Sequence, residues 1–211
     1  MIKILIADDH EIFREGLKQV INQTNEFKVI DEARDSREVL NLALKNTYDV
    51  VILDISMPPG RNGLEVLEEI KKEKPNLQVL ILSMHSEEQY AVQAIKIGAS
   101  GYLTKKSAPH ELVDALHTVI SDHMYISQEV AEQLANEVKR PNEKPIHNLL
   151  SPREFQIFLK IADGESLKEI ANELALSSSS VSTHRARALD KMKLKTNADI
   201  IRYAIKHNLI D

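Results

Sequence analysis

The chain has 211 residues and a formal net charge of −5, and 43% of its residues are hydrophobic. This length exceeds that of one typical compact domain, so one or two domains are expected. The absence of cysteine excludes a disulfide framework and a thiolate zinc site. Because the chain shows neither a signal-peptide pattern nor an apolar run of about 18 residues, we expect a cytoplasmic protein that does not enter a membrane.

Four apolar segments in the first half of the chain have the composition of buried strands, and each leads into polar residues. The segments are residues 2–7 before Asp8 and Asp9, residues 50–53 before Asp54, residues 77–82 before Ser83, and residues 101–103 before Thr104 and Lys105. In a parallel sheet the carboxyl ends of the strands share one edge, and ligands bind in the crevice outside it. The sequence therefore predicts three carboxylates, a hydroxyl and an ammonium at one edge.

Helical patterns alternate with these strands. They lie near residues 10–23, 35–46, 64–73, 86–97 and 108–121. The alternation of strands with five helices predicts a doubly wound α/β domain with a parallel sheet of five strands.

The predicted polar edge suits phosphoryl chemistry. Clustered carboxylates repel one another unless a cation relieves them, and a hard divalent ion such as Mg²⁺ binds oxygen ligands and shares its shell with phosphate. A carboxylate such as Asp54 can also act as a nucleophile and become an aspartyl phosphate. Lys105 would then neutralise phosphoryl charge, and Ser83 would hydrogen-bond an oxygen of the transferred group.

Each of these residues has a simpler interpretation when it is taken alone. An acidic residue at a strand end is most often a helix cap or a solvated turn residue. A phosphatase similar to the haloacid dehalogenases, with Asp54 as its nucleophile, typically needs a second aspartate two residues later, where this chain has Ser56. The joint pattern therefore favours a phosphoacceptor site over either alternative.

Residues 1 to about 120 resemble the receiver domain of two-component response regulators. The resemblance rests on Asp8-Asp9, Asp54 followed by Met57-Pro58 and Gly63-Leu64-Glu65, Ser83, residues 98–102 and Lys105. It implies the strand order 2-1-3-4-5, and it implies that a sensor histidine kinase phosphorylates Asp54. It further implies that Asp9, Asp54 and the Ser56 carbonyl bind Mg²⁺, that Asp8 acts mainly through water, and that Ser83 and Tyr102 form the switch pair.

Two details of this region affect the expected site. Ser56 and His85 flank the phosphate position, so we expect them to tune the lifetime of the phosphoryl group. The loop over residues 58–63 is one residue longer than the commonest form in the family, and we expect it to reshape the rim of the site. A receiver that no longer responds to phosphate is the alternative, and the complete acidic set argues against it.

A change in composition marks the boundary between two domains. Residues 139–147 include Pro141 and Pro145, which disfavour a continuous helix and indicate a linker. Residues 1–146 hold 17 Lys+Arg and 24 Asp+Glu, whereas residues 147–211 hold 10 and 8, so the second part is the more basic. The apolar spacing of residues 127–138 predicts a connector helix. We therefore expect a receiver at 1–121, a connector and linker at 122–148, and a second domain at 149–211.

The second domain has clear helix start signals and no strand pattern. Residues 151–154 and 166–169 are capping boxes, Gly164 between them offers a left-handed stop, and Ser177 caps a third helix. A fourth helix is expected over 197–207. The expected buried positions of the last two helices are Val181, Ala188, Leu189 and Met192, then Ile200, Ile201, Ala204 and Ile205. This pattern predicts a small all-α domain with helix-turn-helix architecture.

The third helix carries residue types that bind DNA. Its cations Arg185, Arg187 and Lys191 can neutralise phosphates, and Ser178, Ser179 and Ser180 crowd its amino terminus, where free N–H groups attract an anionic backbone. The side opposite the apolar stripe holds Ser182, Thr183 and Ala186, which are expected to approach base edges. A basic helix alone is more often a solvated surface, so this interpretation depends on its context.

Residues 149–210 resemble a LuxR-type DNA-binding domain of the NarL class. The resemblance rests on residues 150–154, 161–164, 168–171, 181–184 and Lys191-Met192. It implies a transcriptional regulator, not an enzyme, with the kinase and double-stranded promoter DNA as partners, and it leaves RNA polymerase open as a further partner. Ser182 stands where the class often has lysine, so the DNA sequence that is read stays open.

The two resemblances together suggest a switch. As a hypothesis, the unphosphorylated receiver masks the third helix, and phosphorylation releases this helix. The DNA-binding domain then binds two half-sites, about one helical turn apart, as a homodimer. A phosphorelay intermediate with only protein partners would not need the carboxy-terminal helices.

Overall fold

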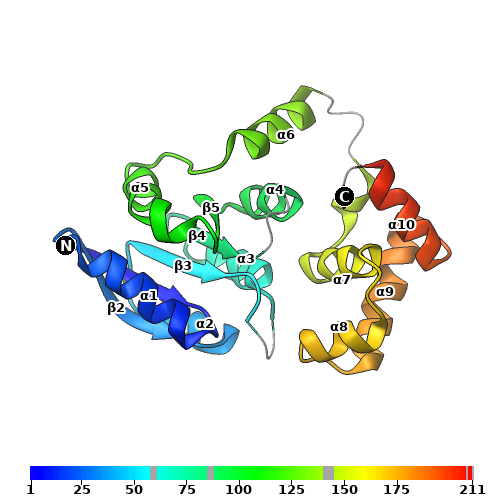
Figure 1. Cartoon of the computed structure of the whole chain (residues 1–211), viewed down its shortest axis with the longest axis horizontal. Coiled ribbons are helices and arrows are strands. Elements are labelled where there is room, and N and C mark those ends of the chain that lie inside the picture. The colour runs from blue at the N-terminus through cyan, green and yellow to red at the C-terminus, as the bar shows by residue number, and fades with distance from the viewer. Residues whose placement is uncertain (58–60, 85–87, 140–144, 208, 211) are drawn as a thin grey trace. The chain divides into compact units, whose positions relative to one another are not determined.

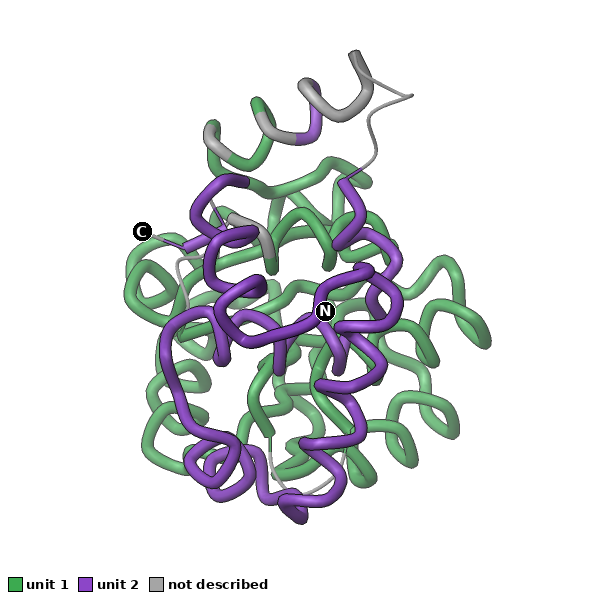
Figure 2. Tube along the Cα trace, turned by 90° about the vertical axis from the view of Figure 1, so that its right-hand side faces the viewer, with its two compact units in different colours: residues 1–132 green, residues 133–211 purple. Residues whose placement is uncertain are grey.

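The computed structural model describes residues 1–57, 61–84, 88–139, 145–207 and 209–210. The chain forms two compact units, residues 1–132 and 133–211, which Figure 2 colours separately. Three features of the sequence analysis lie outside the described residues: loop residues 58–60, His85, and linker residues 140–144. Among the helices that are described, none is both long and apolar enough to cross a bilayer.

The first unit is built on a parallel sheet. Its described residues form five strands in the order β2-β1-β3-β4-β5, which confirms the predicted doubly wound fold (Figure 1). The strands are β1 (Ile2–Ala7), β2 (Phe27–Ala33), β3 (Val50–Asp54), β4 (Gln78–Ser83) and β5 (Gly101–Thr104). In the register, Asp54 pairs with Leu82 and Ser83 pairs with Thr104, so the polar strand ends share one edge.

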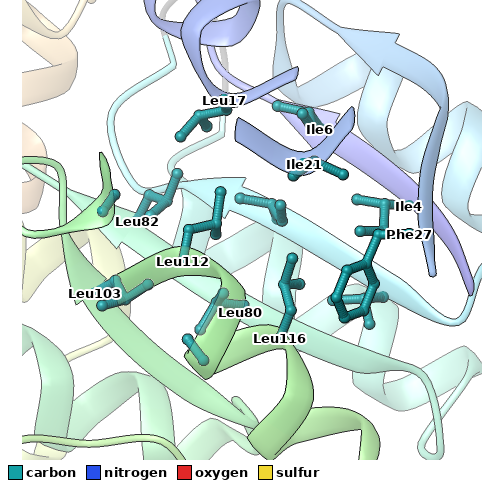
Figure 3. Close-up of a cluster of buried hydrophobic side chains, with 14 of the residues drawn as sticks. Ile4, Ile6, Leu17, Ile21, Phe27, Leu80, Leu82, Leu103, Leu112 and Leu116 are labelled. Atoms are coloured by element: carbon teal, nitrogen blue, oxygen red, sulfur yellow. The ribbon is translucent and has the colours of Figure 1, made fainter. Parts of the chain in front are cut away.

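Five helices of the first unit lie close to the predicted ranges. They are α1 (Glu11–Asn22), α2 (Ser36–Lys45), α3 (Gly63–Glu73), α4 (Glu88–Ile97) and α5 (Ala108–Ile120). Every residue of β3 is buried, as expected for a central strand that is covered on both faces. On one face, α1 and α5 pack against alternate strand residues, with Leu17 and Leu112 close to Ile6 and Leu82 (Figure 3). This core holds the ends of the central strands in fixed positions.

The segment after α5 returns to the edge of the sheet. Tyr125 forms a parallel bridge with Gly101, its carbonyl accepts the Tyr102 N–H at 2.9 Å, and its own N–H donates to the Ser100 carbonyl at 3.1 Å. A Cβ atom at position 101 would lie 2.9 Å from the Tyr125 carbonyl oxygen, so glycine permits this close approach. The predicted connector helix follows as α6 (Gln128–Lys139). The sequence analysis did not predict that the start of the connector pairs with β5.

The second unit is helical in its described residues. Its elements are the 3₁₀ helix η1 (Ile146–Leu149), α7 (Pro152–Ala162), α8 (Leu167–Glu173), α9 (Ser178–Met192) and α10 (Asn197–Lys206). The structure confirms both predicted capping boxes, the cap at Ser177, and the left-handed Gly164, whose φ is +89°. Thr196 adds a capping box that the sequence analysis missed.

One expectation for this unit was wrong. Ile205 is 57% exposed, because the inner face of α10 is formed by Ile200 and Ala204, and position 205 lies about 100° around the helix from position 204. Residues 146–149, which span the expected boundary between the linker at 122–148 and the second domain, form a 3₁₀ turn that Pro145 precedes. The centre of the His147 ring lies 6.0 Å from that of Phe155 in a tilted arrangement and 5.8 Å from that of Tyr203 in an edge-on arrangement, so this turn packs against α7 and α10.

Candidate functional site: an acidic pocket and a DNA-binding helix

The carboxyl edge of the sheet brings two carboxylates and an ammonium together. Asp54 is the last residue of β3, Asp8 follows β1, and Lys105 follows β5. The Lys105 Nζ lies 2.7 Å from Asp54 Oδ2 and 2.6 Å from Asp8 Oδ2, and all three side chains are buried. These three predicted site residues therefore form one charged cluster.

Burial and charge have opposing effects in this cluster. Burial raises the pKa of Asp54 to about 6, although the nearby Lys105 lowers it, and Asp8 adds a further increase. Burial lowers the pKa of Lys105, but the two carboxylates raise it by more, so the net pKa lies above the ordinary value. The pocket thus holds a stable ammonium beside a carboxylate that ionises at near-neutral pH.

Backbone contacts fix the position of Asp54. The Ser56 N–H donates to Asp54 Oδ1 at 3.1 Å. The neighbouring Ile55 N–H donates to the Leu82 carbonyl at 3.0 Å, and the Ile55 carbonyl accepts from Gly63 N–H at 2.7 Å. A side chain at Gly63 would collide with the carbonyl oxygen of Asp54. The start of α3 can therefore approach the end of β3 only because position 63 is glycine.

Asp9 and His10 complete the acidic side of the pocket. The His10 Nδ1 lies 2.8 Å from Asp9 Oδ1 and 3.2 Å from Asp8 Oδ1. One potential ligand atom from each of Asp8, Asp9, His10 and Asp54 lies within 4.8 Å of the other three. An oxygen-rich set of this kind fits a divalent cation. The sequence analysis missed His10, although its position directly after two aspartates was a usable signal.

Arg14 and Phe13 support the pocket from α1. The Arg14 guanidinium is buried, donates to the Asp8 carbonyl at 2.7 Å, and pairs with Glu32 at 3.2 Å. The Lys105 Nζ lies 5.0 Å from the centre of the Phe13 ring, within the range of a cation–π contact. The sequence analysis missed both residues. For Arg14 the reason is that a buried arginine on an amphipathic helix cannot be distinguished from a solvated surface arginine before its partner is known.

The predicted switch pair lies on neighbouring strands. Ser83 ends β4, is 1% exposed, and its carbonyl accepts the Lys105 N–H at 2.7 Å. Tyr102 pairs with Ile81 in the register, and Ile81 and Ser83 are two residues apart, so Tyr102 and Ser83 project from the same face of the sheet. Tyr102 also lines a cavity of about 300 Å³ together with Tyr125 and Val130. The Tyr102 side chain is thus next to the start of the connector.

In the second unit, α9 presents a polar face beside a buried apolar stripe. Val181, Ala188, Leu189 and Met192 are buried, as predicted. The exposed members of the predicted DNA-binding set are Ser178, Ser179, Ser182, Thr183, Ala186, Arg187 and Lys191, whereas Ser180 and Arg185 are half-buried. The helix therefore has one face against the unit and a continuous polar face outside.

Two of the predicted DNA-binding cations have partners within the unit. Lys191 Nζ lies 2.6 Å from Glu154 Oε2, and the same carboxylate accepts the Ser151 N–H at 2.8 Å in the capping box of α7. Arg185 Nε donates to Asn197 Oδ1 at 2.6 Å, which joins α9 to the start of α10. Both side chains thus help to hold α9 against its neighbours.

Comparison with known families matches both units. Residues 4–117 match the response regulator receiver domain, and residues 148–204 match the bacterial regulatory proteins of the luxR family. The chain belongs to the two-component response regulators of the NarL/LuxR class. It is a transcriptional response regulator with a receiver domain and a LuxR-type DNA-binding domain, as the sequence predicted. The members of this family are DNA-binding regulators.

Relatives of this response regulator match it along nearly its whole length. The oxygen regulatory protein NreC of Staphylococcus carnosus is 33% identical over 100% of both chains, and the response regulator UvrY of Escherichia coli K12 is 34% identical over 99% of this chain and 96% of its own. A structure of the RcsB response regulator of Salmonella typhimurium covers 97% of both chains at 25% identity, with a TM-score of 0.67. A structure of an RcsB–DNA complex matches at 26% identity with a TM-score of 0.61, over 97% of this chain and 98% of its own.

Proposed function

We propose that Asp54 is the phosphoacceptor of this response regulator and that a sensor histidine kinase supplies the phosphoryl group. The observation that carries the proposal is the buried Asp54 carboxylate, which has one oxygen on the Lys105 ammonium and the other on the Ser56 N–H. Neither contact would be needed by a solvated turn residue. Both hold the carboxylate in one orientation at the edge of the sheet where ligands bind.

The transfer follows from this arrangement. A carboxylate oxygen of Asp54 forms a bond to phosphorus while the bond from phosphorus to the kinase histidine breaks, and the electron pair stays on the imidazole nitrogen. The ammonium of Lys105 neutralises charge on the phosphoryl oxygens. Ser83, at the adjacent strand end, hydrogen-bonds an oxygen that arrives with the phosphoryl group. The Ser83 side chain moves to make this hydrogen bond. Tyr102, on the same face of the sheet, changes its position in response, so that the two residues act as the switch pair.

A divalent cation fits the acidic side of the pocket. The proposed Mg²⁺ ligands are the carboxylates of Asp9 and Asp54 and the Ser56 carbonyl, with Asp8 acting mainly through water. The clustered carboxylate oxygens support this assignment, because their mutual repulsion is relieved by a cation. When bound, Mg²⁺ supplies positive charge to the transferring phosphoryl oxygens.

We further propose that the polar face of α9 binds promoter DNA. Ser178, Ser179 and Ser180 lie at the amino terminus of α9, where free N–H groups attract phosphate. Ser182, Thr183 and Ala186 would approach base edges, and Arg185, Arg187 and Lys191 would approach the backbone. Since Arg185 and Lys191 also have partners within the unit, Arg187 is the first choice for a phosphate contact. Phosphorylation is expected to favour a homodimer on two half-sites, and the RcsB–DNA complex supports DNA binding by this architecture.

The deciding experiment combines labelling with a binding assay. Wild type and Asp54→Asn are incubated with Mg²⁺ and radiolabelled acetyl phosphate, and promoter binding and molecular mass are then measured with and without beryllofluoride. We expect label, dimer formation and tighter DNA binding in wild type, and none of these responses in Asp54→Asn. Equal labelling of both proteins would place the phosphoacceptor elsewhere. Unchanged DNA binding in labelled wild type would favour a receiver that no longer controls the second domain.

A further inference from the structure

We propose that α9 recognises the methyl groups of thymine, so that the half-sites of this regulator carry thymine at the base pairs that face Thr183 and Ala186. This preference, which rests on the proposed binding of promoter DNA by α9, adds the class of base that the helix selects. It would decide which promoters the regulator reads.

A stripe of short side chains lines the outer side of α9. Its members are spaced by three and four residues, so they lie one above the other along the helix: Ser179, Ser182, Thr183 and Ala186. All four are exposed, on the side away from the buried apolar stripe. Strong base readout by Arg, Asn or Gln uses two groups of one long side chain on a single base. None of these four side chains can bind a base in that way.

The longer side chains of the proposed DNA-binding set have other contacts or lie to one side of this stripe. Arg185 and Lys191 are each held at 2.6 Å by a partner within the unit. Arg187 is exposed, but it lies about 100° around the helix from Ala186. It is therefore placed for a phosphate at the edge of the groove, and the stripe itself is left to face the bases.

The hydroxyl groups of the stripe are partly bound to the helix itself. Thr183 Oγ1 donates to the Ser179 carbonyl at 2.9 Å, so its proton is not free to bind a base. Ser179 Oγ lies 2.8 Å from Oγ of Ser177, the N-cap residue of α9. Thr183 and Ala186 therefore present methyl groups to a ligand outside the helix. The base readout that these methyl groups can make is apolar contact with the C5 methyl of thymine.

Asp190 marks the end of this reading surface. It is the next position on the stripe, four residues after Ala186, and it is exposed. Its carboxylate repels the phosphates of DNA, so close contact is expected in the amino-terminal half of α9, the part of a recognition helix that normally meets base edges. Short side chains also require the helix to lie deep in the major groove, where the thymine methyl group projects.

The test compares thymine with uracil, which pairs in the same way but lacks the C5 methyl group. Full-length protein, with and without beryllofluoride and Mg²⁺, first selects duplexes from a pool with a randomised centre. Each thymine of the selected duplex is then replaced by uracil, one position at a time, and binding is measured by fluorescence polarisation. We expect the affinity to fall about fourfold at each position that faces Thr183 or Ala186, the effect of losing the contact of one methyl group.

Variants of the stripe assign this effect to particular methyl groups. Thr183→Ser keeps the hydroxyl and removes the methyl group, so the difference between thymine and uracil should disappear at one position of each half-site. Thr183→Val keeps a methyl group and should keep the difference. Thr118→Ser is the matched control, because Thr118 makes the same kind of hydrogen bond on α5, to the Asp114 carbonyl at 2.8 Å. Ala186→Gly weakens the helix and hence binding to both duplexes, so the ratio of the two affinities is compared.

Several results would overturn the thymine preference alone. They are equal affinity of wild type for thymine and uracil at every position, loss of the difference in Thr183→Val, and equal weakening of both duplexes by Thr183→Ser. Enrichment of no sequence, with or without beryllofluoride, would instead reject the proposed DNA binding and the thymine preference with it.

Discussion

The Lys105 ammonium lies 2.7 Å from Asp54 Oδ2, with both groups buried at the edge of the sheet. The same ammonium lies 2.6 Å from Asp8 Oδ2. Lys105→Met keeps the length of the side chain but leaves two buried carboxylates without their cation. Removing one partner of a buried pair costs about 3–5 kcal/mol. We expect a loss of that size in the free energy of unfolding of the first unit.

Urea denaturation at pH 8 in the presence of EDTA measures this effect. Lys106→Met is the matched control, because Lys106 is the next residue and is exposed. An unchanged midpoint in Lys105→Met would show that the carboxylates do not depend on Lys105. Addition of Mg²⁺ should restore part of the lost stability, since a bound cation also relieves the carboxylates.

The raised pKa of Asp54 predicts a pH dependence of stability. Burial raises this pKa from 3.8 to about 6. Between these values the folded state keeps a proton that the unfolded state has lost, so stability falls as the pH rises from about 4 to about 6 and is level above that range. The difference of about 2 pKa units corresponds to about 3 kcal/mol.

Asp54→Asn removes this titration. Near pH 4 the variant and wild type should have similar stability, and near pH 7 the variant should be the more stable by up to about 3 kcal/mol, because the raised pKa already includes the attraction to Lys105. The measurement is urea denaturation in EDTA at several pH values between 4 and 8. A difference between the two proteins that stays constant over this range would contradict the raised pKa.

Local sequence patterns predicted the elements of this fold because each pattern has a local cause. The capping boxes at Ser151 and Ser166 need only side chains three residues apart, and the buried strand β3 needs only a continuous apolar run. The strand ends then placed Asp8, Asp54 and Lys105 on one edge. The resemblance to a family added the order of the strands.

Contacts between distant segments could not be predicted in the same way. The Arg14–Asp8 hydrogen bond depends on how α1 lies on the sheet, and the Tyr125–Gly101 bridge depends on where the chain returns after α5. Neither leaves a periodic signal. The pairing of Lys191 with Glu154 joins residues 37 positions apart, so the sequence showed the cation but not its partner.

The surroundings of Gly63 and Gly16 predict opposite effects of alanine substitution at these two positions. A Cβ atom at Gly63 would collide with the Asp54 carbonyl oxygen and lie 2.6 Å from Ile55 Cα, and these are backbone atoms that cannot rotate away. Gly63→Ala should therefore displace Asp54 and lower stability by about 1–3 kcal/mol or more. Gly16, within α1, has open space around it, so Gly16→Ala should raise stability by about 0.5–1 kcal/mol.

Thermal denaturation and acetyl phosphate labelling distinguish these two variants. We expect Gly63→Ala to lose labelling as well as stability, because the acceptor carboxylate moves with its backbone. Gly16→Ala should label as wild type does. Normal labelling of Gly63→Ala would show that the end of β3 can shift without harm to the pocket.

The contacts of α9 predict different roles for Arg187 and Lys191. Arg187 is exposed on the polar face, whereas Lys191 pairs with Glu154 at the start of α7. Arg187→Ala should weaken binding to all DNA sequences, and the slope of log K against log salt should become shallower by about 0.9. Its stability should be unchanged.

Lys191→Ala should instead affect the second unit itself. The ion pair with Glu154 is partly exposed on the lysine side, so solvent screening limits its contribution to about 1 kcal/mol. Hydrogen exchange of α7 and α9 peptides in the full-length chain measures this loss, and fluorescence polarisation with labelled promoter DNA at several salt concentrations measures binding. If Lys191→Ala made the slope of log K against log salt shallower by about 0.9, without faster hydrogen exchange, Lys191 would be a phosphate contact. Only the loss of a released counterion changes that slope while leaving the packing of α9 intact.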